Sequence, residues 1–123
     1  MTLRMTCISD THGRHSSITS VIKEGDVIVH CGDVTSLGKT ADQLISFLSW
    51  FSKLKFTYKI FVAGNHDFYI EKEHESALEI ISRYPSVIYL QDQSLILPFK
   101  NHNVAFYGSP HQPIYHMGAF KLH

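Results

Sequence analysis

The sequence predicts an α/β fold, in which a mixed sheet is flanked by helices. Three apolar runs of strand character each end in Asp, His or Asn beside a glycine. Segments of helical periodicity separate these runs, and short strands at close spacing follow the last helix. Alternating strands and helices are typical of parallel strands joined by right-handed crossovers.

The first two strands are expected at residues 3–9 and 27–31. A loop from Asp10 to Arg14 follows the first strand, and a short helix then begins at Ser16 or Ser17 and ends at about residue 23. The second strand is almost continuously apolar, which is expected of a strand covered on both faces.

The most regular helical pattern follows the loop at residues 34–38. Thr40 and Gln43 have the spacing of a capping box. The apolar residues then recur at i, i+3, i+4 and i+7, namely Leu44, Phe47, Leu48 and Phe51. The third strand is expected at residues 57–63.

In the last part of the chain, the residue pattern predicts one more helix and three short strands. The helix spans residues 71–84, with Pro85 after its end and with Ala77, Leu78 and Ile81 facing inward. The strands are expected at residues 87–90, 95–99 and 104–107, and they have a hairpin-like spacing.

Length and charge restrict the class of protein. The 123 residues fit one domain, which we assign to residues 1–123. Eleven basic and eleven acidic residues leave no net charge, which argues against binding to nucleic acid polymers. We expect no membrane association, because no apolar run approaches the roughly 18 residues that a spanning helix needs. A cytoplasmic location is expected, with no leader peptide.

Cys7 and Cys31 are too few for a disulfide framework and lack the spacing of a zinc or redox motif. Both lie within expected strands. We therefore predict two free thiols that are buried in the core.

The residues that carry chemistry follow the strands. Asp10, His12, Asp33 and Asn65 each come just after an expected strand, so neighbouring parallel strands would bring them to one edge of the sheet. All four side chains are suitable metal ligands. Each motif is weak alone, because Gly-Asp is usually a turn and Asn-His-Asp can cap a helix. Their joint arrangement predicts a metal centre.

Four segments together resemble the calcineurin-like metallophosphoesterase family, and within it the metallophosphoesterase domain-containing proteins. They are Ile8-Ser9-Asp10-Thr11-His12-Gly13-Arg14, His30-Cys31-Gly32-Asp33, Ala63-Gly64-Asn65-His66-Asp67 and Tyr107-Gly108-Ser109-Pro110-His111-Gln112-Pro113. The resemblance implies two divalent metal ions, with Mn favoured and Fe, Zn or Mg also suitable. Such ions, about 4 Å apart, clamp a phosphate and activate a water molecule.

The resemblance also implies roles for the ligands. Asp10 and His12 would hold the first metal, and Asp33 would bridge both ions. Asn65 would bind the second metal and lie beside the substrate.

Three further residues receive roles at the substrate side of the site. His66 would face the substrate, stabilising the phosphoryl group or protonating the leaving oxygen. Asp67 would orient the His66 ring. Arg14 would meet a phosphate oxygen, with a surface salt bridge as the alternative.

The expected function is metal-dependent hydrolysis of a phosphoester, with a small phosphodiester or nucleotide as substrate. The family's later metal ligands come from His-Gly and Gly-His-x-His segments, which this chain does not contain. His116 and His123 lack that spacing. The chain therefore resembles the N-terminal half to two-thirds of a four-layer αββα sandwich, and we expect a partial sandwich.

An alternative is a weakly active or non-catalytic scaffold of the same fold. A sheet face left without its cover would expose apolar surface, which a homodimer could bury. His111, His116 or His123 would then be candidates for substitute ligands across the interface.

Other histidines are expected to be structural. His30 lies within an expected strand, and we predict that it is a hydrogen-bonded core residue. His74 shares a helix face with Ala77 and Leu78, which indicates packing. His111 stands where the family commonly has Trp, and it receives no catalytic role.

Overall fold

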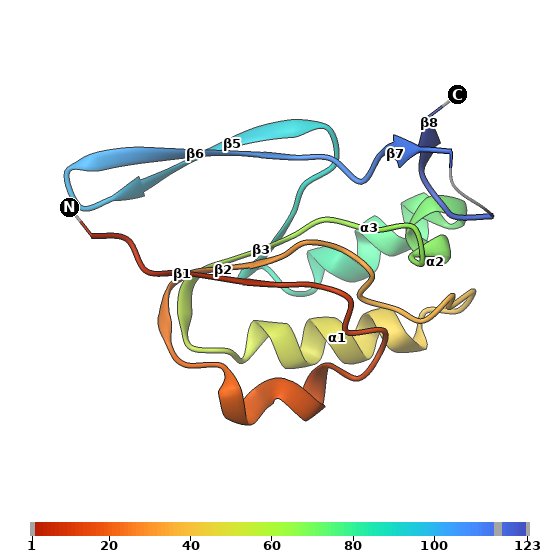
Figure 1. Cartoon of the computed structure of the whole chain (residues 1–123), viewed down its shortest axis with the longest axis horizontal. Helices are drawn as coiled ribbons and strands as arrows, with labels where there is room; N and C mark the ends of the chain where they lie inside the picture. Colours follow the sequence, from red (N-terminus) through yellow and green to blue (C-terminus); the bar gives the residue numbers. More distant parts are fainter. Residues whose placement is uncertain (1, 115–116, 123) are drawn as a thin grey trace.

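The computed structural model describes residues 2–114 and 117–122 and is built on a four-stranded parallel sheet (Figure 1). The strands lie side by side in chain order. They are β1 (Met5–Ile8), β2 (Gly25–His30), β3 (Phe56–Phe61) and β4 (Val87–Tyr89). The α/β class is confirmed, and the strand that was expected to begin a group of hairpins, β4, instead pairs in parallel with β3.

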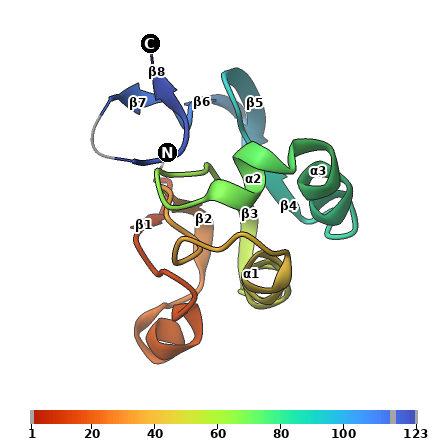
Figure 2. The ribbon, with the colours of Figure 1, turned by 90° about the vertical axis from the view of Figure 1, so that its right-hand side faces the viewer.

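The connections between these strands are helical. They are the 3-10 helix η1 (His15–Val21) and the α-helices α1 (Asp42–Ser52), α2 (Phe68–Lys72) and α3 (His74–Ser82). Because the strand order always advances in the same direction, right-handed crossovers place every connection on one face of the sheet. Figure 2 shows η1 and α1 on one side of the strands and the later strands on the other.

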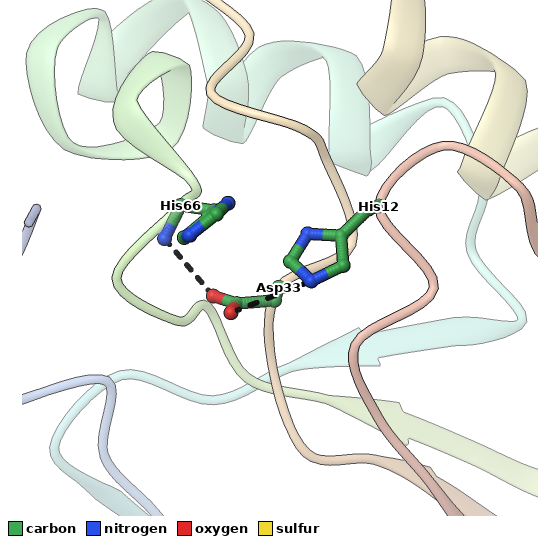
Figure 3. Close-up of side chains that lie close together, drawn as sticks. All are labelled: His12, Asp33 and His66. Atoms are coloured by element: carbon green, nitrogen blue, oxygen red, sulfur yellow. Dashed lines mark hydrogen bonds and ion pairs between the residues drawn. The ribbon is translucent and has the colours of Figure 1, made fainter.

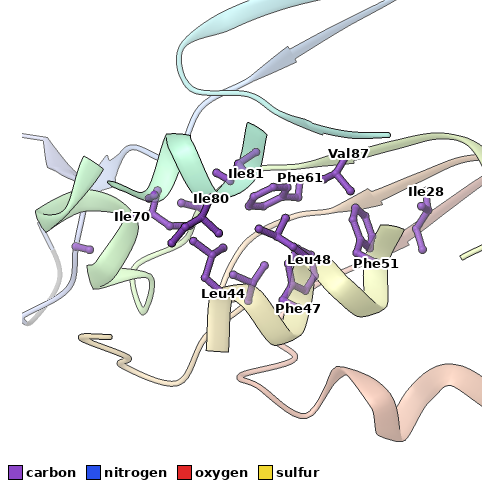
Figure 4. Close-up of a cluster of buried hydrophobic side chains, with 14 of the residues drawn as sticks. Ile28, Leu44, Phe47, Leu48, Phe51, Phe61, Ile70, Ile80, Ile81 and Val87 are labelled. Atoms are coloured by element: carbon purple, nitrogen blue, oxygen red, sulfur yellow. The ribbon is translucent and has the colours of Figure 1, made fainter. Parts of the chain in front are cut away.

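The helical face holds the larger core (Figure 4). Helix α1 buries the four residues that its periodicity predicts, Leu44, Phe47, Leu48 and Phe51. Strand residues Ile28 and Phe61 pack against them, together with Ile70 of α2 and Ile80 of α3. Burial of this continuous apolar surface is the main stabilising contribution to the fold.

The opposite face is covered by an antiparallel hairpin of β5 (Gln93–Phe99) and β6 (His102–Gly108). Leu97 of the hairpin and Leu90 form a smaller core with Val27 and Ile60 of the sheet. The short strands β7 (Gln112–Pro113) and β8 (Lys121–Leu122) form a separate parallel pair that the sequence did not predict. Parallel and antiparallel pairings thus lie in different sheets, so the expected mixed sheet is divided.

The β5–β6 hairpin does not cover strand β1, so this edge of the sheet is exposed to solvent on the hairpin side. Met5 of β1 is 48% exposed, although its side chain points to the same face as the buried Val27 with which it pairs. Cys7 and Cys31 are also exposed, and both are free thiols. The prediction that the thiols are buried is therefore wrong, because the hairpin covers the strands further along the sheet.

The expected helix at residues 71–84 is divided into two. Glu73 is not helical (φ −112°, ψ 52°), and the helical residues begin earlier, at Phe68. The carbonyl of Ile70 accepts a hydrogen bond from His74 Nδ1 (3.3 Å) where a continuous helix would use the backbone N–H of that residue. The buried residues of α3 are Ala77, Ile80 and Ile81, which recur at i, i+3 and i+4, whereas Leu78, expected to face inward, is exposed.

Two expected helix starts also differ in the structure. Helix α1 has no side-chain cap, and Gln43 Oε1 instead accepts a hydrogen bond from the backbone N–H of Ser36 (2.6 Å). The first helix forms as a 3-10 helix, in which Ser17 and Thr19 hydroxyls donate to backbone carbonyls and compete with α-helical hydrogen bonding. Within the described residues, the helices are too short or too polar to cross a membrane.

Candidate metal centre

The loops that follow β1, β2 and β3 carry the candidate site. Backbone hydrogen bonds join the first two loops: Asp10 N–H donates to the Gly32 carbonyl (2.9 Å) and His12 N–H donates to the Asp33 carbonyl (3.0 Å). The strand register therefore continues into the loops. This pairing fixes the positions of the side chains that project from them.

The backbone of these loops is strained. Asp10, His12 and Asp33 have φ values of 57°, 46° and 58°, a left-handed conformation that is costly for residues other than glycine. Such strain persists only where the surrounding structure enforces it, and it is frequent at functional sites. A glycine permits the closest approach: a Cβ at Gly64 would collide with Asp33 Oδ1.

Three side chains converge at the centre of the site, His12, Asp33 and His66 (Figure 3). One potential ligand atom from each lies within 4.8 Å of the others. His12 Nε2 is 4.0 Å from Asp33 Oδ2, and the two imidazole rings are 4.6 Å apart between centroids. The backbone N–H of His66 donates to Asp33 Oδ1 (2.9 Å), which holds the carboxylate beside the two rings.

Asp10 and Asn65 complete the predicted ligand set at the edges of this cluster. Asp10 Oδ1 is 3.8 Å from His12 Nε2, and its side chain is 63% exposed. With its amide nitrogen turned toward Asp33, Asn65 donates to Oδ2 (3.2 Å) and Oδ1 (3.3 Å). With its amide oxygen turned there, two acceptors face each other, and a cation between them would relieve the repulsion.

The donor set fits a divalent metal. His12 Nδ1 lies 3.2 Å from the Thr35 carbonyl, which can only accept, so Nδ1 carries the proton and Nε2 is left free as a ligand. His66 Nδ1 is buried without a hydrogen-bond partner among the described residues. Imidazole nitrogens and carboxylate oxygens suit Mn, Fe, Zn or Mg.

Asp67 has a different place from the one expected. Its buried carboxylate accepts hydrogen bonds from the backbone N–H groups of Val34 (3.2 Å), Thr35 (2.8 Å) and Gly64 (2.8 Å), and from the Thr35 hydroxyl (2.8 Å). Burial raises the pKa of Asp67, and these hydrogen bonds oppose the increase. The expected hydrogen bond to the His66 ring is not formed, so Asp67 ties the loops together.

Thr35 is a site residue that sequence reasoning missed. Its carbonyl orients His12 while its N–H and hydroxyl bind Asp67, and its side chain is buried. The sequence carries no signal for this role, because Thr35 lies in a loop without a recognisable motif.

His30 is the hydrogen-bonded core residue that its position in a strand predicts. Gly32 N–H donates to its Nδ1 (3.2 Å), so Nε2 carries the proton and donates to the Thr11 hydroxyl (2.9 Å). Burial lowers the pKa of His30 to about 4.

A cavity of about 370 Å³ opens at the cluster and is lined by Asp10, Thr11, His12, Arg14, Ser36 and His66. Arg14 therefore lies where a bound anion would be within reach of its guanidinium, and its role with substrate stays a prediction.

The remaining histidines lie away from the ligand cluster or outside the described residues. The His74 side chain donates to the Ile70 carbonyl of the preceding helix, which agrees with the structural role expected of it. His111 pairs with Asp92 Oδ2 (2.7 Å) away from the ligand cluster. His116 and His123 lie outside the described residues.

Most of the chain matches the model of a known family. Residues 3–119 match the family model described as calcineurin-like phosphoesterase.

The chain belongs to the calcineurin-like phosphoesterase family.

Similar proteins extend well beyond the length of this chain. Metallophosphoesterase domain-containing protein 1 of Homo sapiens and that of Mus musculus are each 32% identical over 139 residues, covering 97% of this chain and 40% of the relative. An Emericella nidulans protein named "Probable rhamnogalacturonate lyase C" is 32% identical over 123 residues, covering 97% of this chain and 11% of that protein. The chain thus spans less than half the length of these curated relatives.

Proposed function

We propose that this chain carries the metal-binding part of a phosphoester hydrolase that acts on small phosphodiesters or nucleotides. The observation that supports it most directly is the convergence of His12, Asp33 and His66, whose ligand atoms lie within 4.8 Å of one another. Membership of a metal-dependent phosphoesterase family supports the same chemistry.

The proposed site would hold two divalent ions, with Mn²⁺ as the favoured metal. Asp10 and His12 would hold one ion, Asn65 the other, and Asp33 would bridge them. When bound, these ions supply Lewis-acid stabilisation of phosphoryl charge and lower the pKa of a bound water.

The protein's own residues would position and protonate the substrate. His66 lines the cavity together with Asp10 and His12, so its imidazole would lie next to a bound phosphoester. In its protonated form this group donates a proton to the leaving oxygen. Arg14 would bind a non-bridging phosphate oxygen. We place this activity in the cytoplasm, in line with the expectation from the sequence.

The test is metal-dependent turnover. The purified chain, stripped with a chelator and given Mn²⁺, is assayed with bis(p-nitrophenyl) phosphate. We expect hydrolysis that is abolished by removing the metal and by Asp33→Asn. Hydrolysis that is equal with and without metal would refute the proposal.

A second candidate is the non-catalytic scaffold, and exposed apolar residues favour it. Met5 on the open side of the sheet is 48% exposed, and Ile96 and Tyr107 on the outer face of the hairpin are 66% and 67% exposed. Ile96 and Tyr107 share one face of the hairpin, and a contiguous apolar surface of a few hundred Å² or more usually marks a contact with another protein. We propose a second copy of the chain as that partner. A folded chain that self-associates but shows no metal-dependent turnover would support the scaffold.

A further inference from the structure

A larger cavity, of about 840 Å³, lies next to the metal centre and shares two residues with it. Asn65 and His66 line this cavity, and His66 also lines the smaller cavity that contains Asp10 and His12. A ligand whose phosphorus lies at the metal centre would therefore have its remaining part directed into an adjacent space. That space lies within the size range of small-molecule sites, roughly 300–1,000 Å³.

The wall of the larger cavity is apolar and partly aromatic. Phe68 and Tyr69, in the first turn of α2, line it and also pack against the main core. Leu37 and Met117 line the rim and are 53% and 84% exposed. Two anchored rings beside an exposed rim form a surface on which a planar group can stack.

Charged side chains also line this cavity. Lys39 and Lys72 contribute two ammonium groups, and Glu73 contributes one carboxylate. Lys72 Nζ lies 3.6 Å from Glu71 Oε1 and is partly neutralised by it, so Lys39 is the lining ammonium group that is available to an anion. The cavity therefore combines the two requirements of an aromatic phosphoester, an apolar wall for the ring and positive charge near the phosphate.

We propose that this cavity binds a planar aromatic ester group, so that the substrate class is the aryl phosphoesters. The proposal rests on the proposed function, because it takes the phosphorus to be held beside Asn65 and His66. Phe68, Tyr69 and Leu37 contact the ring, and Lys39 attracts the anion to the cavity.

Calorimetric titration tests the binding step without turnover. The chain in Mn²⁺ is titrated with phenylphosphonate and with methylphosphonate, which carry the same charged head and differ in the apolar group. We expect phenylphosphonate to bind about 10-fold more tightly, which corresponds to burial of part of one ring. Equal affinities, or no binding of either compound, would overturn the proposal.

A variant at the rim locates the ring. Leu37 is half exposed and has a φ of 54°, which asparagine tolerates, so Leu37→Asn should fold normally. It should reduce the preference for phenylphosphonate by about threefold, since apolar contact area is lost. Val21→Asn is the matched control, because Val21 is 74% exposed and does not line the cavity. A preference that Leu37→Asn leaves unchanged would contradict the assignment.

Backbone resonances provide a second measurement. In Mg²⁺, phenylphosphonate should shift the amide signals of Lys39, Tyr69 and Gly118 more than methylphosphonate does. Shifts confined to the Asp10 loop would place the ring elsewhere and overturn the proposal. The outcomes for the two claims are separable: a phenyl preference without diester hydrolysis refutes the hydrolase alone, and hydrolysis with equal affinities refutes the aryl cavity alone.

Discussion

Asp33 is the residue on which the three loops converge. Its carboxylate accepts the backbone N–H of His66, lies within 4.0 Å of the His12 ring and adjoins the Asn65 amide. Its own backbone is held in a left-handed conformation with φ 58°. A buried carboxylate with this many nearby ligand groups is costly unless positive charge compensates it, which a metal ion would supply.

His66 should contribute to the rate more than to metal affinity. In a chain that turns over a diester, His66→Ala should retain its metal and lose about 10²- to 10⁴-fold in kcat, because a positioned proton donor is removed. His102→Ala is the control, since His102 is exposed at the start of β6 and does not belong to the ligand cluster. Metal analysis accompanies the kinetics. Loss of metal in His66→Ala would show that the imidazole is a ligand, as its distance to His12 and Asp33 also permits.

His30 should make stability depend on pH. Its pKa in the folded protein is about 4, below the ordinary value of 6.5, because burial disfavours the charged ring. The unfolded chain then binds more protons between these values, so stability is complete above pH 6.5 and decreases as the pH falls toward 4. The loss is on the order of 3 kcal/mol.

Urea unfolding at pH 7.5 and pH 4.5, with a chelator present, measures this dependence. His30→Gln keeps a donor for Thr11 and removes the titrating group, so it should be less stable overall but lose less stability on acidification. Equal losses in the parent and the variant would exclude His30 as the cause.

At the scale of residues, the sequence predicts which residues lie at the site, but it does not predict the contacts between them. The positions of Asp10, His12, Asp33, Asn65 and His66 follow from their places after strands, because parallel strands align their carboxyl ends. The contact partners of Asp67 do not follow, since they depend on how three loops fold over one another. Thr35 could not be identified for the same reason.

At the scale of elements, apolar patterns define the strands and α1. Every predicted strand lies within two residues of its observed bounds, because burial enforces the period. The division between α2 and α3 was missed, since it depends on a side-chain hydrogen bond from His74 to the Ile70 carbonyl.

Strand β1 is an edge strand, and its open face predicts the reactivity of the thiols. Cys7 and Cys31 are both exposed, so a thiol reagent should label both in the native protein. Cys7→Ser should remove one labelling event and leave the other. Mass spectrometry after brief labelling checks this. Labelling that requires denaturation would show that the face is covered in solution, as in a dimer.

At the scale of the molecule, the two faces of the parallel sheet are covered differently. Helices cover one face of the parallel sheet, whereas a single hairpin covers only part of the other. The sequence predicts the two strands of this hairpin, because their apolar residues follow a regular pattern. It does not predict β7 and β8, because two-residue strands leave no periodic pattern.

The open surfaces should cause self-association. In sedimentation velocity, the chain should show a concentration-dependent shift toward dimers. Met5→Lys with Ile96→Lys should reduce it, because charge opposes burial of the open side of the sheet and of the outer face of the hairpin. Val21→Lys, on the helical side, is the control. A parent chain that remains monomeric at all concentrations would contradict the proposed dimer.

The central claim is that Asp33 and its neighbours hold divalent metal, and metal content tests it most directly. The chain is stripped, given excess Mn²⁺, separated from free metal and analysed by mass spectrometry for ions per molecule, with circular dichroism as a folding control. We predict one to two ions bound by the parent and nearly none by a folded Asp33→Asn variant, because removing this carboxylate removes the shared ligand. Equal metal content in the parent and the variant would contradict the account.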